Sequence, residues 1–157
     1  MFKTLILIIS FVIAWDYFQV NIYKNAIPEK IEIESVIFHD GISDFREGCG
    51  MAIFKISKKS ISDMQKSGLK YFENATLGRD GDNYHAYKKW KSTLFIDSSD
   101  NERIFRGVHC VKESDMPLIW REIEKEAIGN GSFFTTGSEQ DLLVIPNLGV
   151  VVFSFNG

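Results

Sequence analysis

The sequence predicts an α+β fold, in which a mainly antiparallel sheet carries two helices packed on one face and an apolar signal or anchor segment precedes the body. Two observations favour this class. Segments with strand-like patterns outnumber those with helical spacing, and consecutive strand-like segments are mostly joined by short turns. Short turns connect antiparallel neighbours, whereas parallel strands need a longer crossover. We therefore expect hairpins to form most of the sheet.

The composition is that of one globular domain. The chain has 157 residues, of which 45% are hydrophobic and 25% charged, with a net charge of -3. These values exclude a disordered chain, and lysines spread along an acidic chain give no basic patch for nucleic acid. The two cysteines are too few for a four-cysteine zinc site but enough for one disulfide.

The first part of the chain, residues 1–15, is predicted to be a signal peptide or a membrane anchor. Lys3 precedes the apolar run Leu5–Trp15, and a dozen residues form a helix of only about 18 Å, shorter than the hydrocarbon core of about 30 Å. That length suits a cleaved signal peptide. An uncleaved anchor results if the helix continues to Ile22. A buried first element of a cytosolic protein is the third alternative.

Either membrane interpretation predicts export. With Lys3 on the cytoplasmic side, the body faces the periplasm or another extracytoplasmic space, as an anchored protein or as a soluble one after cleavage. Residues 16–30 are predicted to be a polar tether, and residues 31–157 to be a single α+β domain.

Within the domain, alternation predicts strands over 31–38 and 49–56. Ser57 is a suitable N-cap for a helix over about 58–74, where apolar residues recur at helical spacing. Gly68 in that helix indicates a kink or a close packing point. A polar loop covers 76–91.

The second half predicts more strands than helices. Short strands are expected at 93–96 and 104–111, followed by a helix that Ser114 or Asp115 caps and Gly129 ends. The final strands are expected at 133–136, 142–145 and 150–155. The turn signal Pro146–Gly149 joins the last two, and their apolar runs predict that this hairpin is central to the sheet.

Cys49 lies between Gly48 and Gly50, and three interpretations of it stay open. In an oxidising compartment, Cys49 and Cys110 form a disulfide between neighbouring strands. Alternatively, Cys49 is a thiolate nucleophile on a tight turn, with His109, or else His39 or His85, as its base. The third possibility is two free buried thiols.

A metal site is not predicted, and no cofactor is expected. Cys49, Cys110, His39 and His109 are acceptable ligand types, but their spacing matches no common zinc pattern. Adjacent residues on a strand point to opposite faces, so His109 and Cys110 are not expected to share a metal ion.

The polar loop contains the best binding candidates, in which aromatic residues alternate with lysines. Such a surface can hold a carbohydrate, an anionic envelope polymer or a partner protein. In the competing interpretation, the aromatic residues only pin the loop to the body while the lysines point outward. The candidate residues are Tyr84, His85, Tyr87, Lys88 and Trp90.

The predicted function is that of a small exported or membrane-anchored envelope protein acting as a non-catalytic binding module, such as an inhibitor, an immunity-type protein or an assembly factor. Its expected partners are the membrane, through the first segment, and an envelope protein or polysaccharide. The alternative is a thiol-dependent hydrolase that uses Cys49 with a histidine base. A stalk that merely protrudes from the membrane is a third hypothesis.

Overall fold

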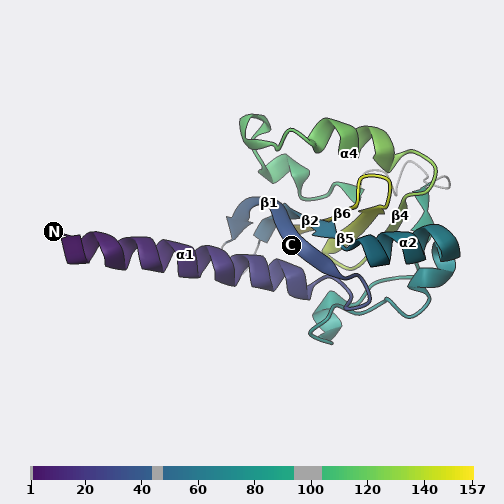
Figure 1. Ribbon diagram of the computed structural model, residues 1–157, viewed down its shortest axis with the longest axis horizontal. Coiled ribbons are helices and arrows are strands. Elements are labelled where there is room, and N and C mark those ends of the chain that lie inside the picture. The colour runs from purple at the N-terminus through teal and green to yellow at the C-terminus, as the bar shows by residue number, and fades with distance from the viewer. Residues whose placement is uncertain (1, 44–47, 94–103) are drawn as a thin grey trace.

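A computed structural model describes residues 2–43, 48–93 and 104–157 and confirms the α+β class (Figure 1). Six strands form one sheet in the order β1-β2-β6-β5-β4-β3, and every neighbouring pair is antiparallel. The strands are β1 Ile33–Ser43, β2 Gly48–Ile56, β3 Lys91–Ser92, β4 Phe133–Thr136, β5 Gln140–Ile145 and β6 Val150–Asn156. The α-helices are α1 Phe2–Asn25, α2 Lys58–Ser67 and α4 Trp120–Ala127.

The last hairpin, β5–β6, lies in the middle of the sheet, as its apolar pattern predicts. All six residues of β5 are buried, and so are the first five of β6. Gly149 closes the turn with φ 67°, a conformation that costs glycine little. This hairpin is therefore the centre of the sheet, with β2 next to β6 on one side and β4 next to β5 on the other.

Helices α2 and α4 cover opposite faces of the sheet, so the prediction of two helices on one face is wrong for this pair. One core cluster joins Phe54 and Phe153 of the sheet to Met64 of α2. The other joins Ile53 and the neighbouring strands to Ile123 of α4. Figure 1 shows α4 above the strands and well apart from α2. Strands that are apolar at every position have no face for water, so each face needs its own cover.

The first body helix, α2, begins as predicted and ends early. The Ser57 side chain accepts a hydrogen bond from the Ser60 amide at 3.1 Å, which caps the helix. The α-helix stops at Ser67, because Gly68 has φ 54°, outside the helical region. A 3₁₀ helix, Gly68–Phe72, then covers most of the rest of the predicted range 58–74.

The segment 104–111, predicted to be a strand, is instead a series of turns that ends in the 3₁₀ helix Val108–Cys110. It crosses a face of the sheet at Gly107. A Cβ atom there would lie 2.0 Å from the carbonyl oxygen of Gly50 and 2.4 Å from that of Phe155. The segment packs on the sheet without joining its ladder: Ile104 and Val111 are buried there, and Phe105 and Val108 are partly buried.

Helix α4 starts at Trp120, later than the predicted caps Ser114 and Asp115. Those two residues belong to a separate 3₁₀ helix, Glu113–Asp115. Met116 then has ψ 135°, because the residue before a proline avoids the helical region.

Of the strand predicted at 93–96, residues 94–96 lie outside the described residues. The described ladder next to them is Lys91–Ser92, which pairs with β4.

The first helix, α1, stands away from the body along most of its length (Figure 1). Residues 4–18 are exposed, and Thr4–Asn25 is long and apolar enough to cross a membrane, with a mean hydropathy of 1.8. Its base is part of the body, since Tyr23, Ala26 and Ile27 are buried in the core. In the range 16–30, predicted to be a polar tether, the chain is helical as far as Asn25, and three apolar residues join the core.

Candidate functional site

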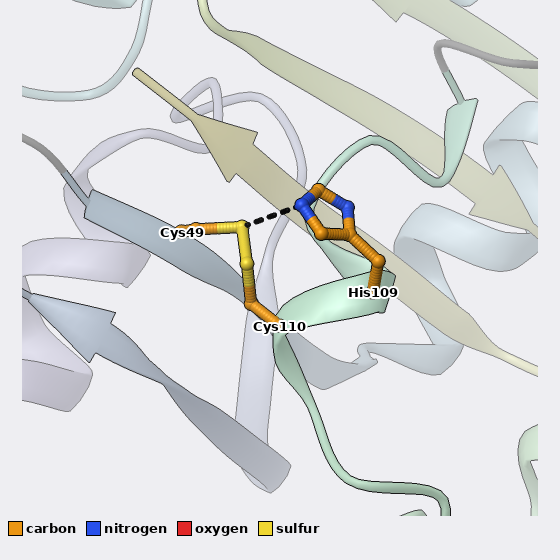
Figure 2. Close-up of side chains that lie close together, drawn as sticks. All are labelled: Cys49, His109 and Cys110. Atoms are coloured by element: carbon orange, nitrogen blue, oxygen red, sulfur yellow. Dashed lines mark hydrogen bonds between the residues drawn. A yellow bond between two sulfur atoms is a disulfide. The ribbon is translucent and has the colours of Figure 1, made fainter.

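Cys49 and Cys110 form a disulfide, as predicted (Figure 2). Their Cα atoms are 5.8 Å apart, and 61 positions separate them in the chain. Cys49 lies at the start of β2, but Cys110 ends the 3₁₀ helix Val108–Cys110. The expectation that both cysteines lie on neighbouring strands is thus wrong, because the segment that carries Cys110 crosses the sheet and does not join it.

His109 lies beside this disulfide, with its Nε2 atom 3.6 Å from the Sγ atom of Cys49 (Figure 2). The ligand atoms of Cys49, His109 and Cys110 lie within 4.8 Å of one another. The sequence argument that His109 and Cys110 point apart assumed a strand. In a 3₁₀ helix, three residues complete a turn, so adjacent side chains are less widely separated in direction.

The other histidines are placed elsewhere. His39 lies on β1, where its Nε2 atom is 2.9 Å from the carboxylate of Asp16 on α1. In His85, the Nδ1 atom is 2.8 Å from the side-chain oxygen of Gln140. Of the three histidines considered as a base for Cys49, the structure therefore brings only His109 to the cysteine.

Backbone contacts other than the disulfide also hold the segment that carries His109. Gly107 sits directly on the backbone of β2 and β6, where no side chain fits. The amide of Cys110 donates to the Gly107 carbonyl at 3.2 Å, and that of Val111 donates to the Val108 carbonyl at 3.0 Å. The start of β2 is fixed in turn, because Cys49 is paired with Ile42 on one side and Asn156 on the other.

Only a thiolate is nucleophilic, and the sulfur of Cys49 cannot form a thiolate while it is bonded to Cys110. A disulfide sulfur can accept a weak hydrogen bond from the imidazole of His109, and the 3.6 Å contact fits that role. The hydrolase hypothesis consequently requires the reduced protein.

Two of the five predicted binding residues are buried and pin the loop to the body. The hydroxyl of Tyr87 donates to the Ala26 carbonyl at 2.8 Å, and the indole of Trp90 donates to the Ala75 carbonyl at 2.6 Å. Trp90 also stacks on Phe72, with ring centroids 4.3 Å apart. Burial raises the pKa of Tyr87 above its ordinary value. These side chains hold the structure together and offer little surface to a partner.

The other three reach the surface to different extents. Tyr84 is 58% exposed, and its hydroxyl donates to Glu139 at 3.3 Å. His85 is half-buried against Gln140. Lys88 is exposed, while its amide fixes the loop by donating to the Thr136 carbonyl at 2.9 Å. The contact surface available from the predicted set is therefore mainly Tyr84 and Lys88.

A cleft of about 650 Å³ lies next to this loop. It carries two basic side chains and hydroxyl groups, and its lining consists of Ala86, Tyr87, Lys88, Arg106, Thr136, Gly137 and Ser138.

Arg106 is the cleft residue that sequence reasoning missed. Its Nε atom is 3.0 Å from the carboxylate of Asp141, which is 1% exposed, and its Nη1 atom donates to the Ser138 carbonyl at 2.6 Å. The sequence did indicate that Asp141 needs a basic partner, because this carboxylate directly precedes the apolar run of a buried strand. The identity of that partner depends on the fold.

No protein-family model, curated protein or solved structure matches this chain. The function is accordingly inferred from the residues described above.

Proposed function

We propose that this protein is a small membrane-anchored envelope protein that acts outside the cytoplasmic membrane as a non-catalytic binding module. Inhibitors, immunity-type proteins and assembly factors are the kinds of activity that such a module performs. Its partner is an envelope protein or polysaccharide, which binds at the cleft between the 84–88 loop and the β4–β5 turn.

The observation that carries this proposal is the contrast between the two parts of α1. Residues 4–18 expose their side chains, most of them apolar, in a helix of sufficient length and hydropathy to cross a membrane. In a soluble protein, an exposed apolar surface of this size promotes aggregation, whereas in a bilayer it is covered. The base of the same helix is built into the core through Tyr23, and Ile27 directly after the helix is buried there too. Such a connection suits an uncleaved anchor better than a removable signal peptide.

Two further features support an extracytoplasmic body. The Cys49–Cys110 disulfide is of the kind that persists in oxidising compartments. Lys3 precedes the apolar helix, and positive charge before a span favours the cytoplasmic side for that end. The body, on the other end of α1, then faces outward.

The chemistry of the cleft supports a hydroxylated or anionic ligand. Lys88 contributes an exposed ammonium group beside Ser138, and Arg106 lines the same cleft. A lysine with a mobile ammonium suits carboxylates that vary in position, such as those of an acidic polymer or an acidic loop. Tyr84 lies on the same 84–88 loop as an exposed aromatic ring.

Photocrosslinking in cells that make the protein tests this surface. We expect a photoreactive amino acid at Ser138 to form a defined adduct with an envelope protein or polysaccharide. The substitution Lys88→Glu should strongly reduce this adduct, because it reverses the charge of the cleft. Lys125→Glu, on the exposed side of α4, is the matched control and should leave the adduct unchanged.

Two outcomes would contradict the cleft as the contact surface: no adduct from Ser138, or equal adduct yields in both charge-reversal variants.

The hydrolase alternative is tested separately by thiol titration of the exported protein without reductant. Two reactive thiols would favour the hydrolase, and no reactive thiol would exclude it in that compartment.

A further inference from the structure

We infer that Cys49, His109 and Cys110 become a binding site for a thiophilic metal ion of the zinc class when a dithiol reduces the disulfide. The oxidised protein then has a covalent link at this point and the reduced protein has a Cys₂His metal site. This inference does not depend on the function proposed above.

The first support is the distance between His109 and Cys49. Zinc binds thiolate sulfur at about 2.3 Å and imidazole nitrogen at about 2.0–2.1 Å, so a tetrahedral angle places the two ligand atoms about 3.6 Å apart. The Nε2 atom of His109 and the Sγ atom of Cys49 are already 3.6 Å apart. The second sulfur, that of Cys110, belongs to the same group, whose ligand atoms all lie within 4.8 Å of one another.

The second support is that backbone contacts other than the disulfide also hold these residues. Gly107 packs against the carbonyls of Gly50 and Phe155, and this contact holds the Val108–Cys110 turn against β2. Cys49 is held by ladder pairing on both sides. On reduction, the sulfurs need only separate from bonding distance to about 3.8 Å, the spacing of two thiolates on a tetrahedral zinc ion. Side-chain rotation of either cysteine supplies a movement of this size.

The third support is access. His109 is exposed, and Cys49 and Cys110 are half-buried, so a small dithiol and a metal ion can both reach the sulfurs. Three protein ligands leave the fourth position of a tetrahedral ion open to water.

The reaction balances without further components. The dithiol gives up two electrons and two protons and becomes a disulfide, while the Cys49–Cys110 bond breaks and each sulfur becomes a thiol. Binding of the divalent ion then displaces one proton from each thiol, and neutral His109 coordinates through Nε2.

Cobalt(II) titration of the full chain in detergent micelles tests this site. After anaerobic reduction with a phosphine, we expect one cobalt ion per chain, with a sulfur-to-metal charge-transfer band that zinc abolishes by competition. The oxidised protein should show no such band. His109→Ala should weaken cobalt binding by at least about tenfold, a loss that even outer-shell partners of metal ligands cause. His39→Ala, which removes a histidine whose Nε2 atom contacts Asp16 and not a cysteine, should leave the affinity unchanged.

Circular dichroism of the reduced protein distinguishes a folded site from binding by an unfolded chain. We expect the spectrum of the metal-free reduced protein to remain that of the folded state. The inference is overturned if the reduced chain binds no cobalt, if it unfolds on reduction, or if His109→Ala and His39→Ala bind cobalt equally well. Cys49→Ser with Cys110→Ser should remove the band while keeping the fold, and a band that persists there also contradicts the site.

Discussion

Cys49 and Cys110 are 61 positions apart in the chain, and the bond between them closes that loop. In the chain-entropy description, a loop of this length restricts the unfolded chain enough to stabilise the folded state by about 4 kcal/mol. The bond fixes the Val108–Cys110 turn to the start of β2, where Gly107 already makes the closest backbone contact. One covalent link therefore reinforces a position that packing has set.

We predict that Cys49→Ser combined with Cys110→Ser lowers the free energy of unfolding by about 4 kcal/mol. Denaturant unfolding, monitored by fluorescence in detergent, measures the difference. The wild-type protein should fall to nearly the same value when a reductant is added, and the double variant should not respond to the reductant. Equal stabilities of the oxidised wild type and the variant would contradict a structural role for the bond.

Tyr87 and Tyr84 show how two tyrosines of one loop differ in role. Tyr87 is buried and donates to Ala26 at 2.8 Å, whereas Tyr84 is 58% exposed. We predict that Tyr87→Phe lowers the free energy of unfolding by about 1–3 kcal/mol, because a buried carbonyl loses its donor. Tyr84→Phe is the matched control and should change it by less than about 0.5 kcal/mol. Comparable losses in both variants, measured by denaturant unfolding, would contradict this assignment.

The same tyrosine predicts a loss of stability in alkali. Burial raises the pKa of Tyr87 in the folded protein above its ordinary value of 10.0. Below that ordinary value both states are neutral and the stability is fully present. As the pH rises further, the unfolded chain ionises first and stability is lost.

We therefore predict that the stability difference between wild type and Tyr87→Phe narrows above a pH of about 10, where only the wild-type unfolded state gains this charge. Unfolding curves at neutral and alkaline pH measure the difference. The contrary result is a difference that stays constant or widens.

At the scale of elements, the strands that follow simple patterns were predictable. The central hairpin combines apolar runs with a turn at Pro146–Gly149, and both strands and their central place are confirmed. The same runs also carried information about helix placement, because strands without a polar face require cover on both sides. The separation of α2 and α4 onto opposite faces was thus implied by the sequence, although the prediction placed them together.

The segment 104–111 shows where pattern reading fails. Ile104, Val108 and Val111 have strand-like character, yet they pack on the sheet without joining its ladder. What decides their conformation is the contact of Gly107 with two strands that are distant in sequence. A contact between remote segments has no local signal, so neither the 3₁₀ helix nor the place of His109 could be predicted.

The base of α1 is an element of the body, and truncation tests this. A chain of residues 16–157 retains Tyr23, Ala26 and Ile27, whereas a chain of residues 31–157 lacks them. We predict that the first folds cooperatively and that the second loses roughly 5 kcal/mol or fails to fold, because two large core side chains and the partner of the Tyr87 hydroxyl are gone. Thermal unfolding followed by circular dichroism compares them. Equal stability would show that residues 16–30 are only a tether.

At the scale of the whole molecule, the candidate site was predictable in part. Cysteine count and the apolar first segment favour the disulfide without knowledge of the fold, although a thiolate nucleophile and two free thiols stayed open as alternatives. The cleft needs such knowledge, since it depends on the pairing of Arg106 with Asp141 and on the distance between two loops. The sequence does not show which aromatic residues of the loop are exposed. Only the structure shows that Trp90 is buried and Tyr84 is not.

The proposed anchoring also constrains how the body sits. The body already contacts α1 at Asp16, through His39. The free part, Phe2–Trp15, measures only about 21 Å, less than the hydrocarbon thickness of about 30 Å. If α1 spans a membrane, residues after Trp15 must complete the span, and this brings the body up against the membrane. Figure 1 shows the end of β1 on the side from which α1 protrudes, and Ile42, opposite Cys49 in the ladder, is 62% exposed there.

The central claim is an uncleaved anchor joined to a disulfide-bonded body. Intact mass of the protein extracted from membranes, after alkylation with and without prior reduction, tests both parts in one measurement. We predict the mass of the full 18.0 kDa chain, no alkylation before reduction and two alkyl groups after it. A mass that lacks the first apolar residues, or two alkyl groups without reductant, would contradict the account.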